Sequence, residues 1–226
     1  TAPATNLTAK EITMTASEKK QLMATACKVR MGVIEGTHGA KAGHPGGSLS
    51  ASDLFTYLYF KELNIDPKNP RWEERDRFVL SKGHTAPGLY AALALRGFFP
   101  MEELGTLNKL GTRLPSHCDR RKTPGVDMTV GSLGQGISAA TGIALGNQLA
   151  GRDSYTYCIV GDGEMDEGSV WESMLLAPQL KLKHYIVIVD NNGMQIDGPT
   201  RDVVNLGNLT AKAAEFGWYA LDADGH

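Results

Sequence analysis

Two short hydrophobic runs, each ending in a polar turn, most constrain how this chain can fold. The first run, residues 155–160, ends in Gly161-Asp162-Gly163, and the second, residues 185–189, ends in Asp190-Asn191-Asn192. Both read as buried strands, whereas residues 167–182 between them carry apolar side chains at helical spacing. A strand, a crossover helix and a strand form a right-handed unit whose two strands are parallel and end at the same edge of the sheet. We therefore expect an α/β fold with a parallel sheet flanked by helices.

The residues at that edge suit a diphosphate and a metal ion. Gly161 and Gly163 have no Cβ, so an anion can approach the main chain and accept hydrogen bonds from backbone N–H groups. Asp162 and Asn192 lie 30 residues apart, and the crossover can bring their carboxylate and amide oxygens to one point. Such oxygen ligands favour Mg²⁺ or Ca²⁺. Each motif alone is also an ordinary turn, so the prediction depends on their combination.

Length and composition fit one domain and exclude some functions. The 226 residues are 42% hydrophobic, which suits a single α/β domain. The net charge is −2 and no basic cluster stands out in the sequence, which argues against a nucleic-acid surface. The sequence shows neither a secretory signal pattern nor an apolar run of 18 residues, so we expect a cytosolic protein without a membrane segment. We expect residues 1–15 to form a loose arm and residues 16–226 to form the domain.

The three cysteines are spaced too widely for a CxxC motif, and their odd number does not make a disulfide framework. We expect Cys27 and Cys158 to be core thiols. Cys118 lies in a polar segment, but no ligand pattern accompanies it, so we expect it to be structural as well.

The rest of the chain predicts further helices, two more strands and two loops. Their expected positions are helices at 17–36 (capped by Ser17), 50–62, 86–95, 101–107 and 137–149, a glycine-rich loop at 36–47, and strands at 77–80 and 218–221. Residues 111–136 have no convincing period. A loop of that length in a compact domain is usually functional, and we interpret it so.

Five motifs in order make the sequence resemble the N-terminal, diphosphate-binding part of transketolase. They are GHPGGSLS at 43–50, DRFVLSKGH at 76–84, PGVDMTVGSLGQGIS at 124–138, GDG at 161–163 with EG at 167–168, and DNNGMQIDG at 190–198. The 27 residues between GDG and the Asn-Asn pair match the spacing of the thiamine-diphosphate motif.

The resemblance implies a role for each matching residue. Asp162, Asn192 and the backbone carbonyl of Met194 would bind the metal, and Gly161 and Gly163 would lie against the diphosphate. The residues expected near the rest of the cofactor are Gly131, Leu133, Asn192 and Ile196. The residues expected to take part in catalysis are His44, His84 and His117 in the substrate channel, and Glu167 and Glu172, which would couple two cofactor sites across a dimer.

The chemistry of ketol transfer agrees with several histidines in one cleft. Alkoxides form and collapse during the reaction, and histidine donates or accepts protons near neutral pH. Glu167 and Glu172 have a simpler alternative explanation as acids in the first turn of a helix, where the macrodipole favours them.

The resemblance also indicates what the 226 residues lack. In the family, the glutamate that activates the cofactor lies on a separate pyrimidine-binding domain, and no such domain is found in this sequence. We therefore expect half of an active site, completed by a pyrimidine-domain chain (the C-terminal transketolase subunit) in a dimer or heterotetramer that acts on sugar phosphates. The sequence ends where the family continues, so we expect the C-terminal end of the domain to be truncated.

Two other functions remain open at this stage. The α chain of a 2-oxo-acid dehydrogenase also carries GDG and Asn-Asn, but its substrate has no sugar hydroxyls to occupy three histidines. A non-catalytic module that binds diphosphate would have no need of those histidines. An enzyme of this type acting on an unusual phosphosugar is a third possibility.

Overall fold

The computed structural model describes residues 14–196 and 198–225. Of the arm expected at residues 1–15, residues 1–13 lie outside the described part of the chain.

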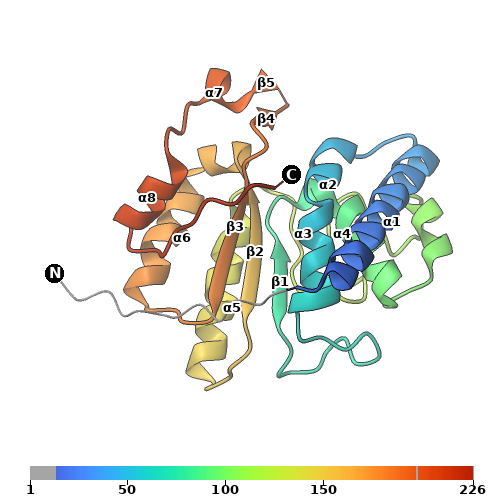
Figure 1. Cartoon of the computed structure of the whole chain (residues 1–226), viewed down its shortest axis with the longest axis horizontal. Helices are drawn as coiled ribbons and strands as arrows, with labels where there is room; N and C mark the ends of the chain where they lie inside the picture. The colour runs from blue at the N-terminus through green and yellow to red at the C-terminus, as the bar shows by residue number, and fades with distance from the viewer. Residues whose placement is uncertain (1–13, 197, 226) are drawn as a thin grey trace.

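Three parallel strands form the main sheet (Figure 1). They are β1 (Arg77–Leu80), β2 (Thr156–Gly161) and β3 (Tyr185–Asp190), and β2 lies in the middle. The register pairs Leu80 with Ile159 and Gly161 with Asp190. The predicted unit of strand, crossover helix and parallel strand is therefore confirmed, and the residues after all three strands meet at one edge.

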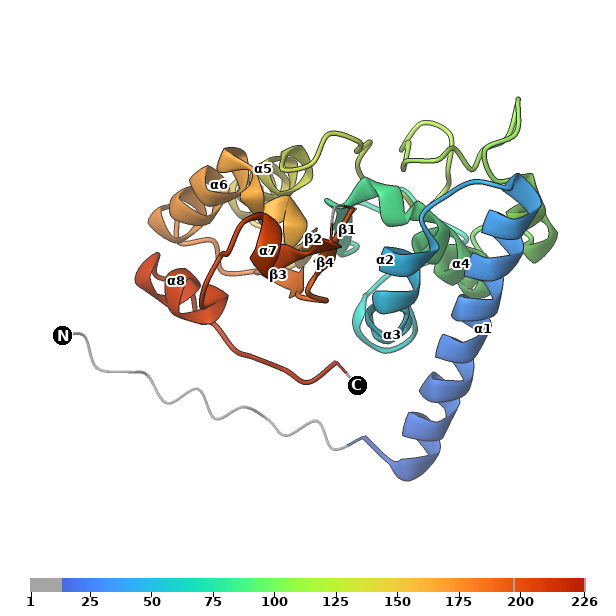
Figure 2. The same ribbon diagram turned by 90° about the horizontal axis from the view of Figure 1, so that it is seen from above.

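Helices cover both faces of the sheet, as the view from above shows (Figure 2). On one face, Phe78 and Ile159 pack in a core with α1 (Ala16–Ala40), α3 (Ser52–Tyr57) and α4 (Ala86–Arg96). On the other face, Val79 and Val160 pack against α5 (Gln135–Leu149) and α6 (Gly168–Gln179). Neighbouring residues of a strand point to opposite faces, so a sheet covered twice needs the nearly continuous apolar runs seen in the sequence.

The first helix begins and ends at other residues than expected. Thr15 caps α1 rather than Ser17: its hydroxyl accepts a hydrogen bond from the backbone N–H of Glu18, whose carboxylate accepts one from the backbone N–H of Thr15. This reciprocal capping box satisfies two N–H groups at the helix start. The helix then continues through Gly36, which is buried against Leu104 and Leu107, to Ala40. The loop expected at 36–47 therefore shrinks to residues 41–44.

The helix expected at 50–62 is three shorter pieces. These are α2 (Pro45–Ser50), α3, and a π-helical turn, η1 (Leu58–Glu62). Short 3-10 helices occur at η2 (Gly83–Thr85), η3 (Met101–Thr106) and η4 (Gly163–Asp166), so the helix expected at 101–107 is a 3-10 helix. Within the described residues, none of the helices combines the length and apolar character that a bilayer span requires.

The C-terminal part of the chain folds over the end of β3. It comprises a small hairpin of β4 (Met194–Gln195) and β5 (Gly198–Pro199), then α7 (Thr200–Val203) and α8 (Leu209–Glu215). The prediction of a strand at 218–221 is wrong. Residues 218–221 form no strand, and the indole N–H of Trp218 donates to the carbonyl of Met174 in α6 at 2.7 Å.

Two of the three cysteine predictions hold. Cys158 and Cys118 are buried, and burial raises the pKa of the Cys118 thiol to about 12, so it stays protonated and unreactive. The prediction for Cys27 is wrong, because this thiol is exposed on α1. Helical spacing alone did not show which face of α1 is covered.

Candidate functional site

Asp162 forms the centre of the polar sheet edge. It follows β2 and is only 2% exposed. Its Oδ1 accepts a hydrogen bond from Gly163 N at 2.9 Å, and its Oδ2 accepts bonds from Gly193 N at 2.8 Å and Thr200 Oγ1 at 2.9 Å. These donors hold the loop after β3 against the end of β2. A carboxylate offers about four lone-pair positions, so three donors leave room for a further ligand.

The other two residues expected to bind metal lie on the loop that Asp162 holds. Gly193, which Asp162 contacts directly, separates Asn192 from Met194. The Asn192 side-chain oxygen accepts a bond from Met194 N at 3.0 Å. The structure thus brings the carboxylate, the amide and the Met194 segment to one turn. Nearby, Ile196 is 98% exposed and makes no apolar core contact.

Gly163 is needed for the close contact between this loop and β2. A Cβ at Gly163 would lie 2.8 Å from Cβ of Gln195, so a larger residue would push β4 away. Gly161 donates its N–H to Glu164 Oε2 at 3.1 Å.

Three histidines from separate segments gather at the same edge. His44 precedes α2, His84 lies in η2 directly after β1, and His117 lies in the long loop. The ring centroid of His44 lies 5.2 Å from that of His84 and 6.1 Å from that of His117. The three rings predicted to share a channel therefore form one cluster.

The cluster keeps its partly buried members neutral. Burial is the main cause that lowers the pKa of His84 to about 4, and the nearby His44, Lys82 and His117 lower it further. Burial and His44 also lower the pKa of His117. A neutral imidazole can accept a proton or donate its N–H, as a proton-transferring group must.

A buried carboxylate that we did not predict, Glu164, positions the loop before α5. Its Oε1 accepts bonds from Ser81 Oγ at 2.6 Å and Gly134 N at 2.8 Å. Glu164 therefore connects the ends of β1 and β2 to the loop that carries Gly131 and Leu133. Gly131 is exposed, and a Cβ there would meet nothing within 4 Å, so a bulky group can approach its main chain.

A second buried pair that we did not predict joins the ends of the two outer strands. Lys82, after β1, forms an ion pair with Asp190 at the end of β3, and Lys82 is 2% exposed. Ser50 of α2 donates to Asp190 Oδ1 at 2.8 Å. The pair thus connects the sheet to α2, and His44 lies directly before the first residue of that helix.

The chain matches the family model for the transketolase, thiamine diphosphate binding domain, over residues 20–226. The chain belongs to the transketolase family.

Relatives of this chain include proteins named as transketolase subunits. The chain is 55% identical over 184 residues to the 6-deoxy-6-sulfo-D-fructose transketolase subunit SqwG of Clostridium sp., covering 81% of this chain and 67% of that protein. It is 38% identical over 198 residues to an apulose-4-phosphate transketolase subunit of Phocaeicola vulgatus, covering 88% of this chain and 70% of that one. Against human transketolase the identity is 39%, covering 89% of this chain but only 32% of the longer protein.

Solved structures show the same fold. Transketolase from Leishmania mexicana superposes with a TM-score of 0.83 at 34% identity, over 87% of this chain and 31% of that one. Transketolase from Campylobacter jejuni superposes with a TM-score of 0.82 at 31% identity, over 88% of this chain and 32% of that one. The chain therefore spans about a third of these transketolase chains.

The two glutamates expected to couple neighbouring sites lie at the N-terminal end of α6, where Glu167 packs beside Gly134. Glu167 is the N-cap residue of α6, and Glu172 lies in the second turn, so the explanation of Glu172 as a first-turn acid does not hold. Both are exposed. Their carboxylates form no hydrogen bond or ion pair within the ranges 14–196 and 198–225.

The oxygen ligands at the edge suit a hard cation that also binds a diphosphate. No cluster of three or more histidine, cysteine or acidic side chains suited to metal binding occurs among the described residues. The edge instead offers one carboxylate, one amide oxygen and the Met194 carbonyl, which cannot fill six positions without a ligand that brings oxygens of its own. Open space at Gly131 leaves room for the rest of such a ligand.

Proposed function

We propose that this chain is the thiamine-diphosphate-binding half of a transketolase, which transfers a two-carbon ketol unit between phosphosugars. The observation that carries the proposal is the joint position of Asp162, held to the 192–194 turn, and the three clustered histidines. One arrangement suits a diphosphate with Mg²⁺, or Ca²⁺, and the other suits a polyhydroxylated substrate. The family match favours this function over a 2-oxo-acid dehydrogenase α chain or a non-catalytic module.

Each residue of the site would have a separate task. Asp162, Asn192 and the Met194 carbonyl would hold the metal, and Gly161 and Gly163 would let the diphosphate reach the main chain. Gly131, Leu133 and Ile196 would line the remainder of the cofactor. Bound thiamine diphosphate supplies an acidic carbon that adds to a carbonyl and an electron sink for the bond that breaks.

The histidines would move protons to and from the sugar. His84 and His117 are held neutral, so each can accept a proton from a sugar hydroxyl and return it to a developing alkoxide. His44, which neighbours both, would orient the hydroxyl between them. In the family, the glutamate that activates the cofactor lies on the pyrimidine-binding domain.

A partner chain would therefore complete the site. The relatives that this chain covers by about two thirds are named as subunits, which supports a pyrimidine-domain chain as that partner. We infer a dimer or heterotetramer in which Glu167 and Glu172 couple neighbouring sites. A cytosolic location and a place in pentose phosphate metabolism belong to the same proposal.

Metal-dependent cofactor binding tests the proposed site. Calorimetry with thiamine diphosphate and Mg²⁺, with the partner chain present, should show binding that Asp162→Ala abolishes. Asp162 also holds the 193–200 loop, so Thr200→Val is the matched control, because it removes one bond to that loop and keeps the carboxylate. Unchanged affinity in Asp162→Ala would refute the metal assignment.

Reconstitution with the partner chain tests the reaction. The mixture should transfer a ketol unit from xylulose 5-phosphate to ribose 5-phosphate, and the chain alone should not. A parallel assay with 6-deoxy-6-sulfo-D-fructose as donor is warranted, because the relative with 55% identity is named for that sugar. A pair that consumed only pyruvate would favour the dehydrogenase instead.

A further inference from the structure

A groove of about 740 Å³ lies at the other edge of the sheet from the proposed cofactor site. Arg77, the first residue of β1, lines it, whereas Lys82 and His84 follow the last residue of the same strand. In Figure 1 the chain between η1 and β1 lies below the sheet, and β4 and β5 lie above it. The volume of the groove falls in the range of about 300–1,000 Å³ that small-molecule sites occupy.

Cationic side chains from two segments face this groove. Six of its lining residues are cationic and one is acidic, although the whole chain has a net charge of −2. The cationic residues are Arg71, Arg75, Arg77, Arg120, Arg121 and Lys122. The sequence did not reveal the cluster, because 43 residues separate Arg77 from Arg120.

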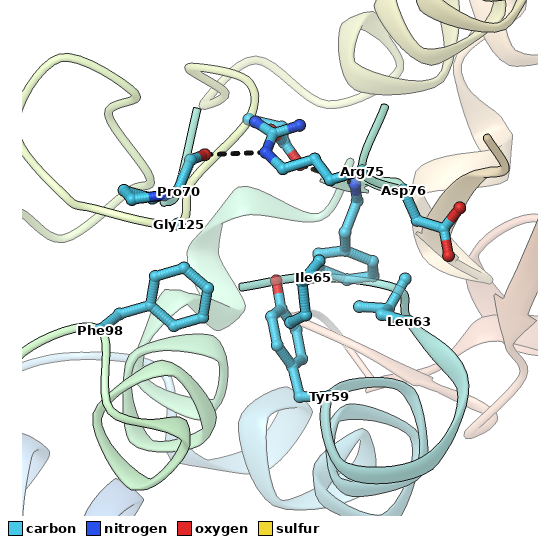
Figure 3. A pocket seen from close by; sticks show the side chains of 10 residues that line it. Tyr59, Leu63, Ile65, Pro70, Arg75, Asp76, Phe98 and Gly125 are labelled. Atoms are coloured by element: carbon cyan, nitrogen blue, oxygen red, sulfur yellow. Dashed lines mark hydrogen bonds and ion pairs between the residues drawn. The ribbon is translucent and has the colours of Figure 1, made fainter. Parts of the chain in front are cut away.

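Arg75, which lines the groove, has one side-chain donor without a partner among the described residues. The Nε–H of Arg75 donates to the carbonyl of Pro70 at 2.7 Å, as Figure 3 shows. This hydrogen bond lies beside an adjoining cavity of about 10 Å³. Arg75 also forms an ion pair through Nη2 with Asp127. Its Nη1 is buried without a hydrogen-bond partner in the described residues. A buried guanidinium N–H without an acceptor leaves the positive charge of Arg75 only partly compensated beside the groove.

Like charges are crowded at the same place. Arg77 donates to the carbonyls of Arg75 and Glu73, and not to a carboxylate. Burial is the main cause that lowers the pKa of Arg77, and the positive charges of Arg75 and Arg152 contribute. An anion bound here would relieve that repulsion.

The second wall is a fixed turn and not a loose loop. The buried Thr123 donates its hydroxyl to the carbonyl of Arg113 at 2.5 Å, and the backbone N–H of Thr123 donates to the carbonyl of Asp119 at 3.0 Å. Arg121 forms a distant pair with Asp119 at 3.6 Å. Arg71, Arg120 and Lys122 are exposed and form no ion pair within the described part of the chain.

We propose that this basic groove binds a small polyanion that carries two or more phosphate groups. Cationic side chains on two walls match a ligand with several separate anionic oxygens better than a single phosphate. The site is distinct from the proposed cofactor site and does not depend on it.

Calorimetry of the full chain with inorganic tripolyphosphate, in EDTA and low salt, tests the proposal. The wild type should bind tripolyphosphate saturably and more tightly than monophosphate. The triple variant Arg71→Gln, Arg120→Gln, Lys122→Gln should bind at least about tenfold more weakly, since three exposed charge contacts are lost. These residues are on the surface, so the variant should fold normally.

A matched control separates a specific site from general charge attraction. The variant Lys19→Gln, Lys20→Gln, Lys28→Gln removes the same charge from exposed positions of α1 and should bind tripolyphosphate within about twofold of the wild type. Equal weakening in both triple variants, or no saturable binding to the wild type, would overturn the proposal. Unchanged affinity for tripolyphosphate in the Arg71, Arg120, Lys122 variant would place the anion elsewhere and overturn it as well.

Discussion

Lys82 and Asp190 are buried charges at the ends of the first and third strands, and each depends on the other. Two charges removed from water are stable when they remain paired and hydrogen-bonded, whereas a single one left behind is costly. Ser50 supplies a further hydrogen bond to Asp190. Single substitutions of this pair should therefore have larger effects than its joint replacement.

A protein without the amine of Lys82 should unfold more easily. We expect Lys82→Met to lower the free energy of unfolding by about 3–5 kcal/mol, because Asp190 would stay buried without its counter-charge. Urea unfolding followed by circular dichroism measures this. The double variant Lys82→Met, Asp190→Leu should recover part of the loss. Arg30→Met, which breaks the exposed pair with Asp53, is the control and should cost less than about 1 kcal/mol. Equal losses in Lys82→Met and Arg30→Met would contradict this account.

His84 should make stability depend on pH. Its pKa is about 4 in the folded chain and 6.5 in its unperturbed state, so between these values the unfolded chain binds a proton that the folded chain does not. The contribution is complete above pH 6.5 and is lost as the pH falls towards 4. When the pH is lowered from 7 to 5, the midpoint of urea unfolding should therefore fall more for the wild type than for His84→Gln.

Removing a neighbouring ring should shift the titration of the others. We expect His44→Gln to raise the pKa of both His84 and His117, because the positive charge of His44 lowers both. Histidine ring signals in NMR spectra recorded from pH 3 to 8 would show it. Midpoints that stay unchanged would mean that His44 does not contribute to either pKa.

The same sequence reasoning found some site residues and missed others. Asp162 was predicted because its Gly-Asp-Gly turn and the Asn-Asn pair follow two strands that one helix joins, a combination that neither turn gives alone. Lys82 and Asp190 also follow strands, but whether a charge is buried depends on a partner 108 residues away, which no local pattern reveals. Glu164 was missed for the same reason, since its donors Ser81 and Gly134 come from other segments.

Among the elements, α5 owes its position to one glycine. A Cβ on Gly136 would lie 2.5 Å from the Cα of Ser81, so the helix start sits directly on the end of β1. Ser81 Oγ in turn accepts the N–H of Ile137 at 3.0 Å. This contact places the 131–134 loop beside the polar edge.

Two glycines of α5 should respond oppositely to the same substitution. Gly136→Ala should lower the free energy of unfolding by about 1–3 kcal/mol, because the backbone of Ser81 cannot yield. Gly142→Ala, at an exposed position with open space, should raise it by about 0.5–1 kcal/mol, because alanine favours the helix. Thermal unfolding of both variants checks the prediction, and a stabilised Gly136→Ala would refute the proposed packing.

Strands were predicted better than helix ends. The expected strands at 77–80, 155–160 and 185–189 agree with β1, β2 and β3 to within a residue, because buried parallel strands have continuous apolar runs. The segment 218–221 has a similar composition but no strand beside it. The region 45–62 divides into three helical pieces, and hydrophobic spacing does not distinguish a π-helical turn from an α-helix.

At the scale of the whole molecule, the exposed carboxylates on α6 should matter only in the assembly. We expect Glu172→Gln to leave the unfolding free energy of the isolated chain within about 0.5 kcal/mol of the wild type, because the side chain is exposed and without a partner in the part described. In sedimentation experiments with the pyrimidine-domain chain, the same variant should weaken assembly. Glu35→Gln on the exposed side of α1 is the control. Equally strong assembly of Glu172→Gln and Glu35→Gln would show that Glu172 does not contribute to the interface.

The ion pair between Lys82 and Asp190 also bears on the order in which the protein folds. The residues it joins are separated by 108 positions and belong to the two outer strands, so β2 must already lie between them before the pair can close. Contacts between such distant residues form late, because the chain must lose conformational entropy before the contact can stabilise it. A nascent chain that ends before residue 190 would therefore carry the histidine segments and the GDG turn without a formed site.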